Sequence, residues 1–265
     1  MQRPHPVINN IVIACPDGTW IEDAKRWEGA PRELALFYGD LLGMKIVRED
    51  WLKIGWDDGR RPHLAFGDGP TPEYLPPRFG DPERPQQVHL EIPVADLDAA
   101  GELAIRLGAT VLDEQTNHRT YADPVGHPFC LYHEPTEPTV PGGPLSSRIG
   151  RIVFDCFSPR SLAAFWSELL DMPLRVEDSP VRVAIARQDD SQPMLGFQHA
   201  IVPAPRWPDP KYPQQLHLDV YFADGKAGQQ LAESLGAIRL PAIGGSCPVY
   251  ADPAAHPFCL CQPGQ

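Results

Sequence analysis

The sequence contains no long hydrophobic run. No stretch approaches the roughly 20 consecutive apolar residues that a helix needs to cross a bilayer. The opening segment, MQRPHPVINN, has no apolar segment behind its single arginine, as a secretory signal would require. These two absences lead us to expect a cytoplasmic protein without a membrane partner.

Positive charge is also scarce. The chain has 23 lysines and arginines against 35 aspartates and glutamates, which gives a net charge of −12. No local cluster of basic residues departs from this balance. Because a nucleic-acid backbone is bound through concentrated positive charge, we exclude nucleic acid as a partner.

Several common motifs are missing. The chain has no glycine-rich phosphate loop, no GxSxG nucleophile elbow and no CxxC pair. Cysteine itself is rare, with six in 265 residues. Four of the six lie in apolar, strand-like runs at matching places of two repeated segments: Cys15 and Cys156, and Cys130 and Cys259. We therefore expect free, buried thiols and no disulfide framework.

The sequence does contain a duplication. The segment YADPVGHPFCL at 121–131 returns as YADPAAHPFCL at 250–260. The segment RELALFYGDLLGM at 32–44, whose apolar residues have helical spacing, returns as RSLAAFWSELLDM at 160–172. A repeat of this length is far longer than a solenoid unit, so each copy should be a compact domain with its own core.

Each copy divides again into two similar halves. A strand, a helix and short strands are followed by a proline-rich connector, after which the pattern restarts at 86–94 in the first copy and at 214–221 in the second. The prediction is an α+β chain in which each copy is a pair of β-α-β-β-β halves. The first domain covers 1–137, a linker covers 138–148 and the second domain covers 149–265.

The first copy carries an insertion. Matched helices begin 128 residues apart and matched strands 141 residues apart, so the first copy holds 13 additional residues. They fall within PDGTWIEDAKRWEGAP, 16–31, which contains Trp20 and Trp27. We interpret this segment as a surface loop or short helix pinned by its aromatic residues, with a lid over a pocket as the alternative.

The repeated elements resemble the vicinal oxygen chelate superfamily, and most of all its glyoxalase-like branch. The resemblance rests on the β-α-β-β-β halves, the QxHLE and QxHLD strands, the helices followed by LGA and the DPxxHPFCL turns, and it covers nearly the whole chain. It implies two tandem domains whose curled mixed sheets form clefts. Members include glyoxalase I, extradiol dioxygenases, epimerases, thiol transferases acting on fosfomycin and bleomycin-binding resistance proteins, so the resemblance leaves the activity open.

The resemblance also implies where a metal would bind. Metal-dependent members take ligands from the first strand of each half and from a Glu on the closing strand. Here His89 and His217 lie on the strand that supplies a His ligand. The other matching positions hold Asn10 and Arg151 on first strands, and Cys130 and Cys259 on closing strands. Because we expect Arg151 to lie beside His217 and to repel a divalent ion, we predict no metal or other cofactor, with Zn, Fe, Ni or Mn as the alternative.

Each copy also offers a histidine with a carboxylate two residues later. Strand alternation places His89 and Glu91 on one face, as it does His217 and Asp219, so each pair should point into a cleft. Such a pair is an acid and base in outline, although a structural polar network is the alternative. We assign His89 and Glu91 as the catalytic candidates.

Three further histidines have other interpretations. His127 and His256 adjoin the turn aspartates and should stabilise the turns. His63 has Met194 at the matching position, so it is either a surface residue or a pocket group of the first copy.

Two function classes remain open for a small organic molecule held in an apolar cleft. The chain is a sequestering, resistance-type binding protein, or it is a catalyst. The catalyst would be a metal-free lyase, isomerase or cyclase with His89 or His217 as general base, or a metal-dependent lyase, isomerase or dioxygenase. We expect the first copy to hold the better site and the protein to be a monomer or homodimer. The ligand-binding candidates are Asn10, His63, Cys130, His217, Asp219 and Cys259.

Overall fold

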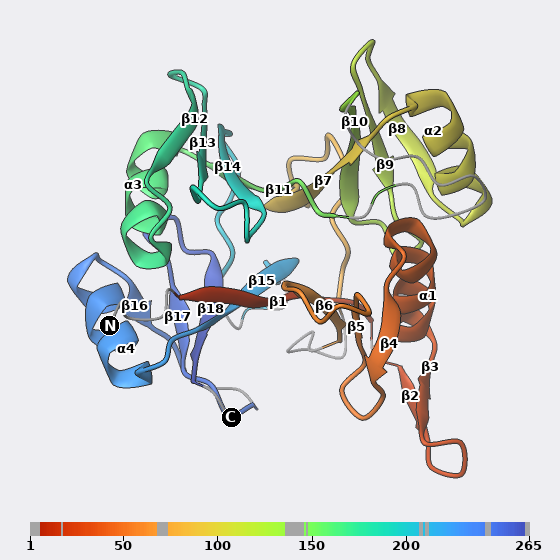
Figure 1. Ribbon diagram of the computed structural model, residues 1–265, viewed down its shortest axis with the longest axis horizontal. Helices are drawn as coiled ribbons and strands as arrows, with labels where there is room; N and C mark the ends of the chain where they lie inside the picture. The colour runs from red at the N-terminus through yellow and green to blue at the C-terminus, as the bar shows by residue number, and fades with distance from the viewer. Residues whose placement is uncertain are drawn as a thin grey trace.

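The fold consists of two large sheets flanked by helices (Figure 1). The computed structural model describes residues 6–16, 18–67, 74–135, 146, 148–206, 209, 212–241 and 245–262. In these residues the chain forms two eight-stranded mixed sheets, four helices and one two-stranded hairpin. Most of the predicted linker, 138–148, lies outside the described residues.

The first sheet is centred on β1 (Val7–Ile13), which runs antiparallel to β15 (Leu216–Tyr221) and parallel to β6 (His63–Phe66). Its strand order is β16-β17-β18-β15-β1-β6-β5-β4. The remaining strands are β4 (Lys45–Arg48), β5 (Lys53–Gly55), β16 (Ile238–Arg239), β17 (Val249–Ala251) and β18 (Pro257–Cys261).

The second sheet repeats this plan around β7 (Val88–Val94) and β11 (Arg151–Cys156), which are antiparallel. Its strand order is β12-β13-β14-β11-β7-β10-β9-β8. The remaining strands are β8 (Thr110–Glu114), β9 (His118–Ala122), β10 (Pro128–His133), β12 (Leu174–Asp178), β13 (Arg182–Ala186) and β14 (Met194–His199).

Each sheet therefore combines one half from each copy. The first half of copy one pairs with the second half of copy two through β1 and β15, and the two inner halves pair through β7 and β11. The predicted α+β fold with β-α-β-β-β halves is confirmed, and each sheet joins halves of different copies rather than the two halves of one copy. A repeat reveals which segments are alike, whereas backbone hydrogen bonds can join any two compatible strand edges.

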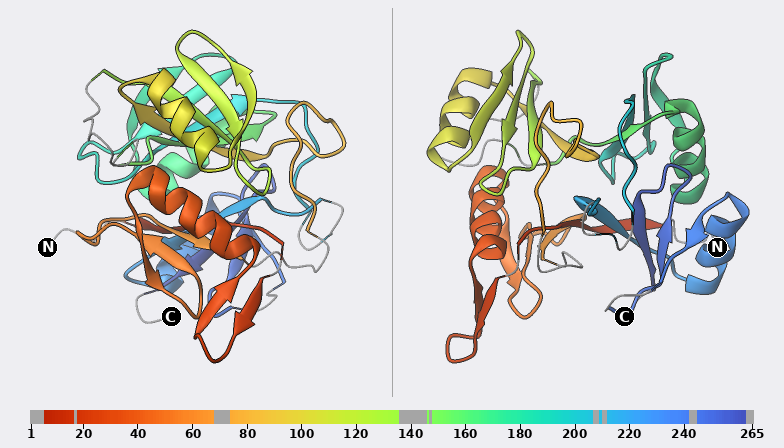
Figure 2. Two further views of the ribbon diagram at one scale, coloured as in Figure 1. Left: turned by 90° about the vertical axis from the view of Figure 1, so that its right-hand side faces the viewer. Right: turned by 180° about the vertical axis from the view of Figure 1, so that it is seen from behind.

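The helices cover the outer sides of the sheets, with α1 and α2 on one side of the molecule and α3 and α4 on the other (Figures 1 and 2). Their bounds are α1 (Ala30–Leu42), α2 (Leu97–Arg106), α3 (Pro159–Leu170) and α4 (Gly225–Ser234). Both repeated helices are confirmed, at α1 and α3. None of the helices in the described part of the chain is long and apolar enough to cross a membrane.

Aromatic packing under the helices stays within each copy. Phe37 of α1 packs edge-on against Phe129 of β10, with ring centroids 5.7 Å apart. Trp166 of α3 packs against Phe258 of β18, with centroids 5.0 Å apart. The helices thus tie together the two halves of one copy, while the central ladders tie together the two copies.

The insertion of the first copy is a β-hairpin made of β2 (Thr19–Ile21) and β3 (Arg26–Glu28). Trp20 and Trp27 face each other across it, with ring centroids 5.7 Å apart, and the Trp27 indole donates a hydrogen bond to the Asp50 carbonyl. The hairpin extends from one end of α1 away from the second sheet (Figure 1). The predicted loop or short helix is wrong, because a cross-strand aromatic pair stabilises a hairpin here.

The cysteines are only partly as expected. Cys130, Cys156 and Cys259 are free thiols and Cys15 is buried outside any disulfide of the described chain, but Cys247 and Cys261 form a disulfide with their Cα atoms 5.0 Å apart. The prediction of free thiols is therefore wrong for this pair. The antiparallel pairing of β17 with β18, in which Val249 lies opposite Cys259, places the two cysteines opposite each other.

Candidate functional site

A cavity of about 510 Å³ lies at the second sheet. Strand residues of both copies line it, including Cys130 of β10 and Arg182 of β13. Its lining is mainly polar and charged: Phe79, Gln86, His89, Glu91, Asp113, Asn117, His118, Thr120, Cys130, Tyr132, His133, Arg151, Glu177, Arg182 and Gln198. The expectation of an apolar cleft is wrong here, because strand alternation directs apolar side chains toward the helices and polar ones into the cavity.

His89 and Glu91 both line this cavity from β7, as their spacing predicted. His89 Nε2 lies 3.9 Å from Glu91 Oε1, and both residues are buried. Cys130, on the neighbouring strand β10, contacts the Thr120 hydroxyl at 3.4 Å. His89 Nδ1 is buried without a hydrogen-bond partner. The predicted polar pair is thus in place on the cavity side of β7.

Two arginines from the second copy bind Glu91. Arg182 Nη2 donates to Oε1 at 2.6 Å, and Arg151 Nη1 donates to Oε2 at 3.3 Å. Arg182 was missed by the sequence analysis. Strand alternation puts Arg182 and Ala184 on the same face of β13. Only the pairing of the two copies in one sheet reveals that Glu91 is the partner of Arg182.

The pKa values follow from this cluster. Burial disfavours the Glu91 carboxylate, but His89 and Arg182 outweigh burial and lower the pKa of Glu91 to about 2. Burial likewise disfavours the His89 imidazolium, but Cys130 and Glu91 raise the pKa of His89 to about 10. The raised pKa of His89 favours its protonated form, in which both ring nitrogens are hydrogen-bond donors. The predicted role of general base would first require loss of this proton.

This cluster does not suit a divalent metal. The carboxylate that would ligate it is engaged by two guanidinium groups, which remain charged and repel a cation. His89 and Cys130 alone fall short of the three protein ligands typical of a catalytic metal site.

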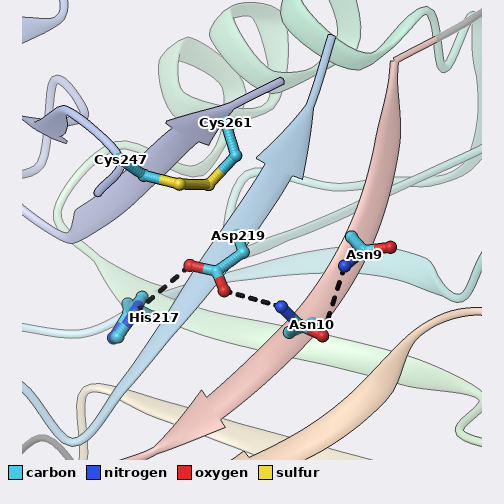
Figure 3. The surroundings of a disulfide bond; sticks show 6 residues. All are labelled: Asn9, Asn10, His217, Asp219, Cys247 and Cys261. Carbon is cyan, nitrogen blue, oxygen red and sulfur yellow. Dashed lines mark hydrogen bonds and ion pairs between the residues drawn. A yellow bond between two sulfur atoms is a disulfide. The ribbon is translucent and has the colours of Figure 1, made fainter. Parts of the chain in front are cut away.

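The first sheet holds a second cluster, formed by His217, Asp219 and Cys259. One potential ligand atom from each lies within 4.8 Å of the other two. His217 Nε2 is 3.4 Å from Asp219 Oδ1, and the Asn10 amide donates to Asp219 Oδ2 at 2.7 Å. Figure 3 shows Asn10 reaching Asp219 from the neighbouring strand, near the Cys247–Cys261 disulfide.

The structure corrects one argument against a metal in this cluster. Arg151 was expected beside His217 and Cys259, but it lies in the other sheet, against Glu91. The neutral Asn10 occupies the corresponding place, because β1 and not β11 pairs with β15. A nitrogen, an oxygen and a sulfur donor together match the ligand types of zinc. The residues of the first sheet therefore fit a divalent ion, whereas those of the second do not.

The protonation of this cluster sets a condition on metal binding. Burial opposes the charge of His217, but Cys259 and Asp219 raise the pKa of His217 to about 10. Burial also raises the pKa of Cys259, although His217 opposes this shift, and His217 and Asn10 hold the pKa of Asp219 low against burial. A metal would therefore displace protons from His217 and Cys259 on binding.

His63 lies on β6, next to Asn10 of β1 in the strand register. It is buried, which favours the pocket-group interpretation over the surface one. Burial and the nearby cations Arg61 and Lys53 lower the pKa of His63 to about 4, so the ring is neutral.

His127 and His256 occupy the turns, as predicted. Asp123 Oδ1 accepts hydrogen bonds from the backbone N–H groups of 125–127, and the His127 ring lies 3.1 Å from Asp123 Oδ2. His256 contacts Asp252 in the same way at 3.3 Å. Both histidines belong to the turn structure and not to the cavity.

Solved structures share this architecture over nearly the whole chain. Glyoxalase I from Zea mays matches with a TM-score of 0.60 at 13% identity, covering 96% of this chain and 91% of that one. A proposed dioxygenase from Bacillus subtilis subsp. subtilis str. 168 matches with a TM-score of 0.61 at 13% identity, covering 97% and 85%. At such low identity these similarities show the fold alone. No curated protein gave a match.

The family assignment comes from the sequence of both copies. A model of the glyoxalase-like domain matches residues 28–132 and again residues 151–261. These matches cover most of the chain and coincide with the two copies of the duplication. The chain therefore belongs to the glyoxalase-like domain family of the vicinal oxygen chelate superfamily.

Proposed function

We propose that the protein binds a small, polar organic molecule in the cavity of the second sheet and does so without a metal. The observation that carries this proposal is the cavity of about 510 Å³ with His89 and Glu91 buried in its lining. Such a volume lies in the range of small-molecule sites, and a few fixed polar groups are enough to orient a ligand there.

The charges of the cluster define what it does to a bound molecule. Glu91 stays ionised and fixes His89, Arg151 and Arg182 around it. His89 carries a proton that it can donate to an oxygen of the ligand, and it acts as a general acid if the ligand reacts. Binding alone needs only the hydrogen bond, whereas a lyase or isomerase also needs proton transfer.

Native mass spectrometry of protein purified without denaturation tests the proposal, followed by calorimetry with the molecule that it identifies. We expect His89→Gln to weaken binding of that molecule roughly tenfold or more, as for other charge-assisted hydrogen bonds. The matched control is His217→Gln, which changes the corresponding histidine of the first sheet. A ligand lost from His217→Gln but retained by His89→Gln would place the site in the other sheet.

The second candidate is a metal-dependent lyase, isomerase or dioxygenase that uses the first sheet. The close approach of the donor atoms of His217, Asp219 and Cys259 favours it. A divalent ion held there would supply a Lewis acid that polarises an oxygen of the substrate. Asn10 would keep Asp219 oriented through its amide hydrogen bond.

Cobalt(II) titration distinguishes this candidate, because a cobalt–thiolate bond produces a charge-transfer absorption band. We expect the band in the wild-type protein and in Cys130→Ser, and its loss in Cys259→Ser. Absence of the band in the wild-type protein at saturating cobalt, or its persistence in Cys259→Ser, would reject the three-residue site.

A further inference from the structure

Resting on the proposed function, we infer that the ligand of the second-sheet cavity is a small organic anion and that Arg151 is the residue that selects it. The ligand class is an oxyanion, such as a carboxylate or phosphonate, on a small organic body.

Two guanidinium groups are concentrated around Glu91. His89, Arg151 and Arg182 all approach this carboxylate, and Glu177 is the one further carboxylate in contact with Arg182 in the described chain. Asp113, elsewhere in the cavity lining on β8, accepts hydrogen bonds from the Gln115 side chain. The lining carboxylates Glu91, Glu177 and Asp113 are matched in number by His89, Arg151 and Arg182. The two guanidinium groups concentrate positive charge beside Glu91, where a bound anion would interact favourably with it.

In the described chain Arg151 makes one ion pair, whereas Arg182 makes two. Arg182 contacts Glu91 through Nη2 and Glu177 through Nε. Arg151 contacts Glu91 through Nη1 alone, and its Nε is buried without a hydrogen-bond partner. A guanidinium group has five N–H donors and prefers to bind an oxyanion through two of them at once. Because the side chain is partly exposed, the accessible part of its guanidinium can donate to an oxyanion in the cavity.

Tyr132 supports Arg151 from one side. The guanidinium carbon lies 5.7 Å from the centre of the Tyr132 ring, within the range of a cation–π contact. Both residues line the cavity, and the Arg151 side chain is 26% exposed. Arg151 is thus held in place and still accessible to a ligand.

The first sheet has a neutral residue at the position that matches Arg151. Asn10 occupies the register position of Arg151, opposite Asp219 as Arg151 is opposite Glu91. Its neutral amide donates to that carboxylate. At this register position the two sites therefore differ by a cation, and a guanidinium group lies against the carboxylate in the second sheet.

Calorimetry with matched pairs of compounds tests the inference. The probes are benzoate against benzamide, and phenylphosphonate against its dimethyl ester, titrated into the full chain. We expect each anion to bind at least tenfold more tightly than its neutral counterpart. We expect Arg151→Gln to reduce anion affinity roughly tenfold to a hundredfold while leaving the neutral compounds unchanged. Arg151→Lys, which keeps the charge but loses the fork of donors, should fall between.

The control is Arg175→Gln, which removes the same charge from β12 of the same sheet at an exposed position outside the cavity lining. It should leave every affinity unchanged, and thermal melts of all variants verify that they are folded. Equal binding of neutral and anionic probes, or equal losses in Arg151→Gln and Arg175→Gln, would overturn the anion class and leave the proposed function standing. No saturable binding of any probe would count against both.

Discussion

Arg151 of β11 stands opposite Glu91 of β7 in the central ladder of the second sheet, and its Nη1 lies 3.3 Å from the Glu91 carboxylate. The two residues come from different copies of the duplication. Their contact therefore exists because the second sheet combines one half from each copy. It places a guanidinium group beside the buried carboxylate of the cavity.

Glu91→Gln should destabilise the protein by about 2–3 kcal/mol, because it leaves two guanidinium groups and an imidazolium without their shared carboxylate. Partial exposure of both arginines keeps the loss below that of a fully buried pair. Urea unfolding followed by circular dichroism measures the change. Glu177→Gln is the control, since this more exposed residue contacts Arg182 alone in the described chain, and its loss should stay below about 1 kcal/mol. Similar losses in both variants would contradict a central role for Glu91.

Acid should destabilise the protein partly through Glu91. The folded-state pKa of Glu91 is about 2, below its ordinary value of 4.5. The stability that it contributes is therefore present above pH 4.5 and is lost as the pH falls toward 2. Unfolding free energies measured across this window should decline less steeply in Glu91→Gln than in the wild-type protein. Parallel curves for the two proteins would show that Glu91 titrates normally.

Alkali should destabilise the protein through His89 and His217. Both have folded-state pKa values of about 10, above the ordinary 6.5. Their contribution is fully present below pH 6.5 and is lost as the pH rises toward 10. NMR titration of the imidazole protons should show both rings charged at pH 7. Chemical shifts of neutral imidazole at that pH would refute the prediction.

Reduction of Cys247–Cys261 should lower stability by about 2–3 kcal/mol, because a disulfide that closes a short loop restricts the unfolded chain. Urea unfolding with and without a reductant measures the effect. Cys247→Ser should match the reduced wild-type protein and should not respond to reductant. A continued response in that variant would mean that another disulfide forms.

The sequence was informative wherever the structure depends on local periodicity. Helical spacing located α1 and α3 to within two residues at each end, and strand alternation placed His89 with Glu91 and His217 with Asp219. These features depend on neighbours along the chain, which a single sequence displays directly.

The strand pairing between copies could not be obtained in this way. Four similar halves present similar strand edges, and the backbone groups that join them are the same in every residue. Pairing β7 with β11 brought Arg151 and Arg182 to Glu91, and it removed Arg151 from the vicinity of His217. The prediction that neither site holds a metal stays a prediction, but for the first sheet it has lost its electrostatic basis.

The combination of halves from both copies in each sheet also explains why a covalent duplication is useful. Two separate chains of one copy each could complete each other's sheets around a twofold axis, but identical chains would build two identical pockets. Joining the copies removes that symmetry, so that a change at position 151 leaves position 10 untouched. The tandem chain can therefore keep an arginine beside one carboxylate and an amide beside the other, and its two sheets can diverge independently.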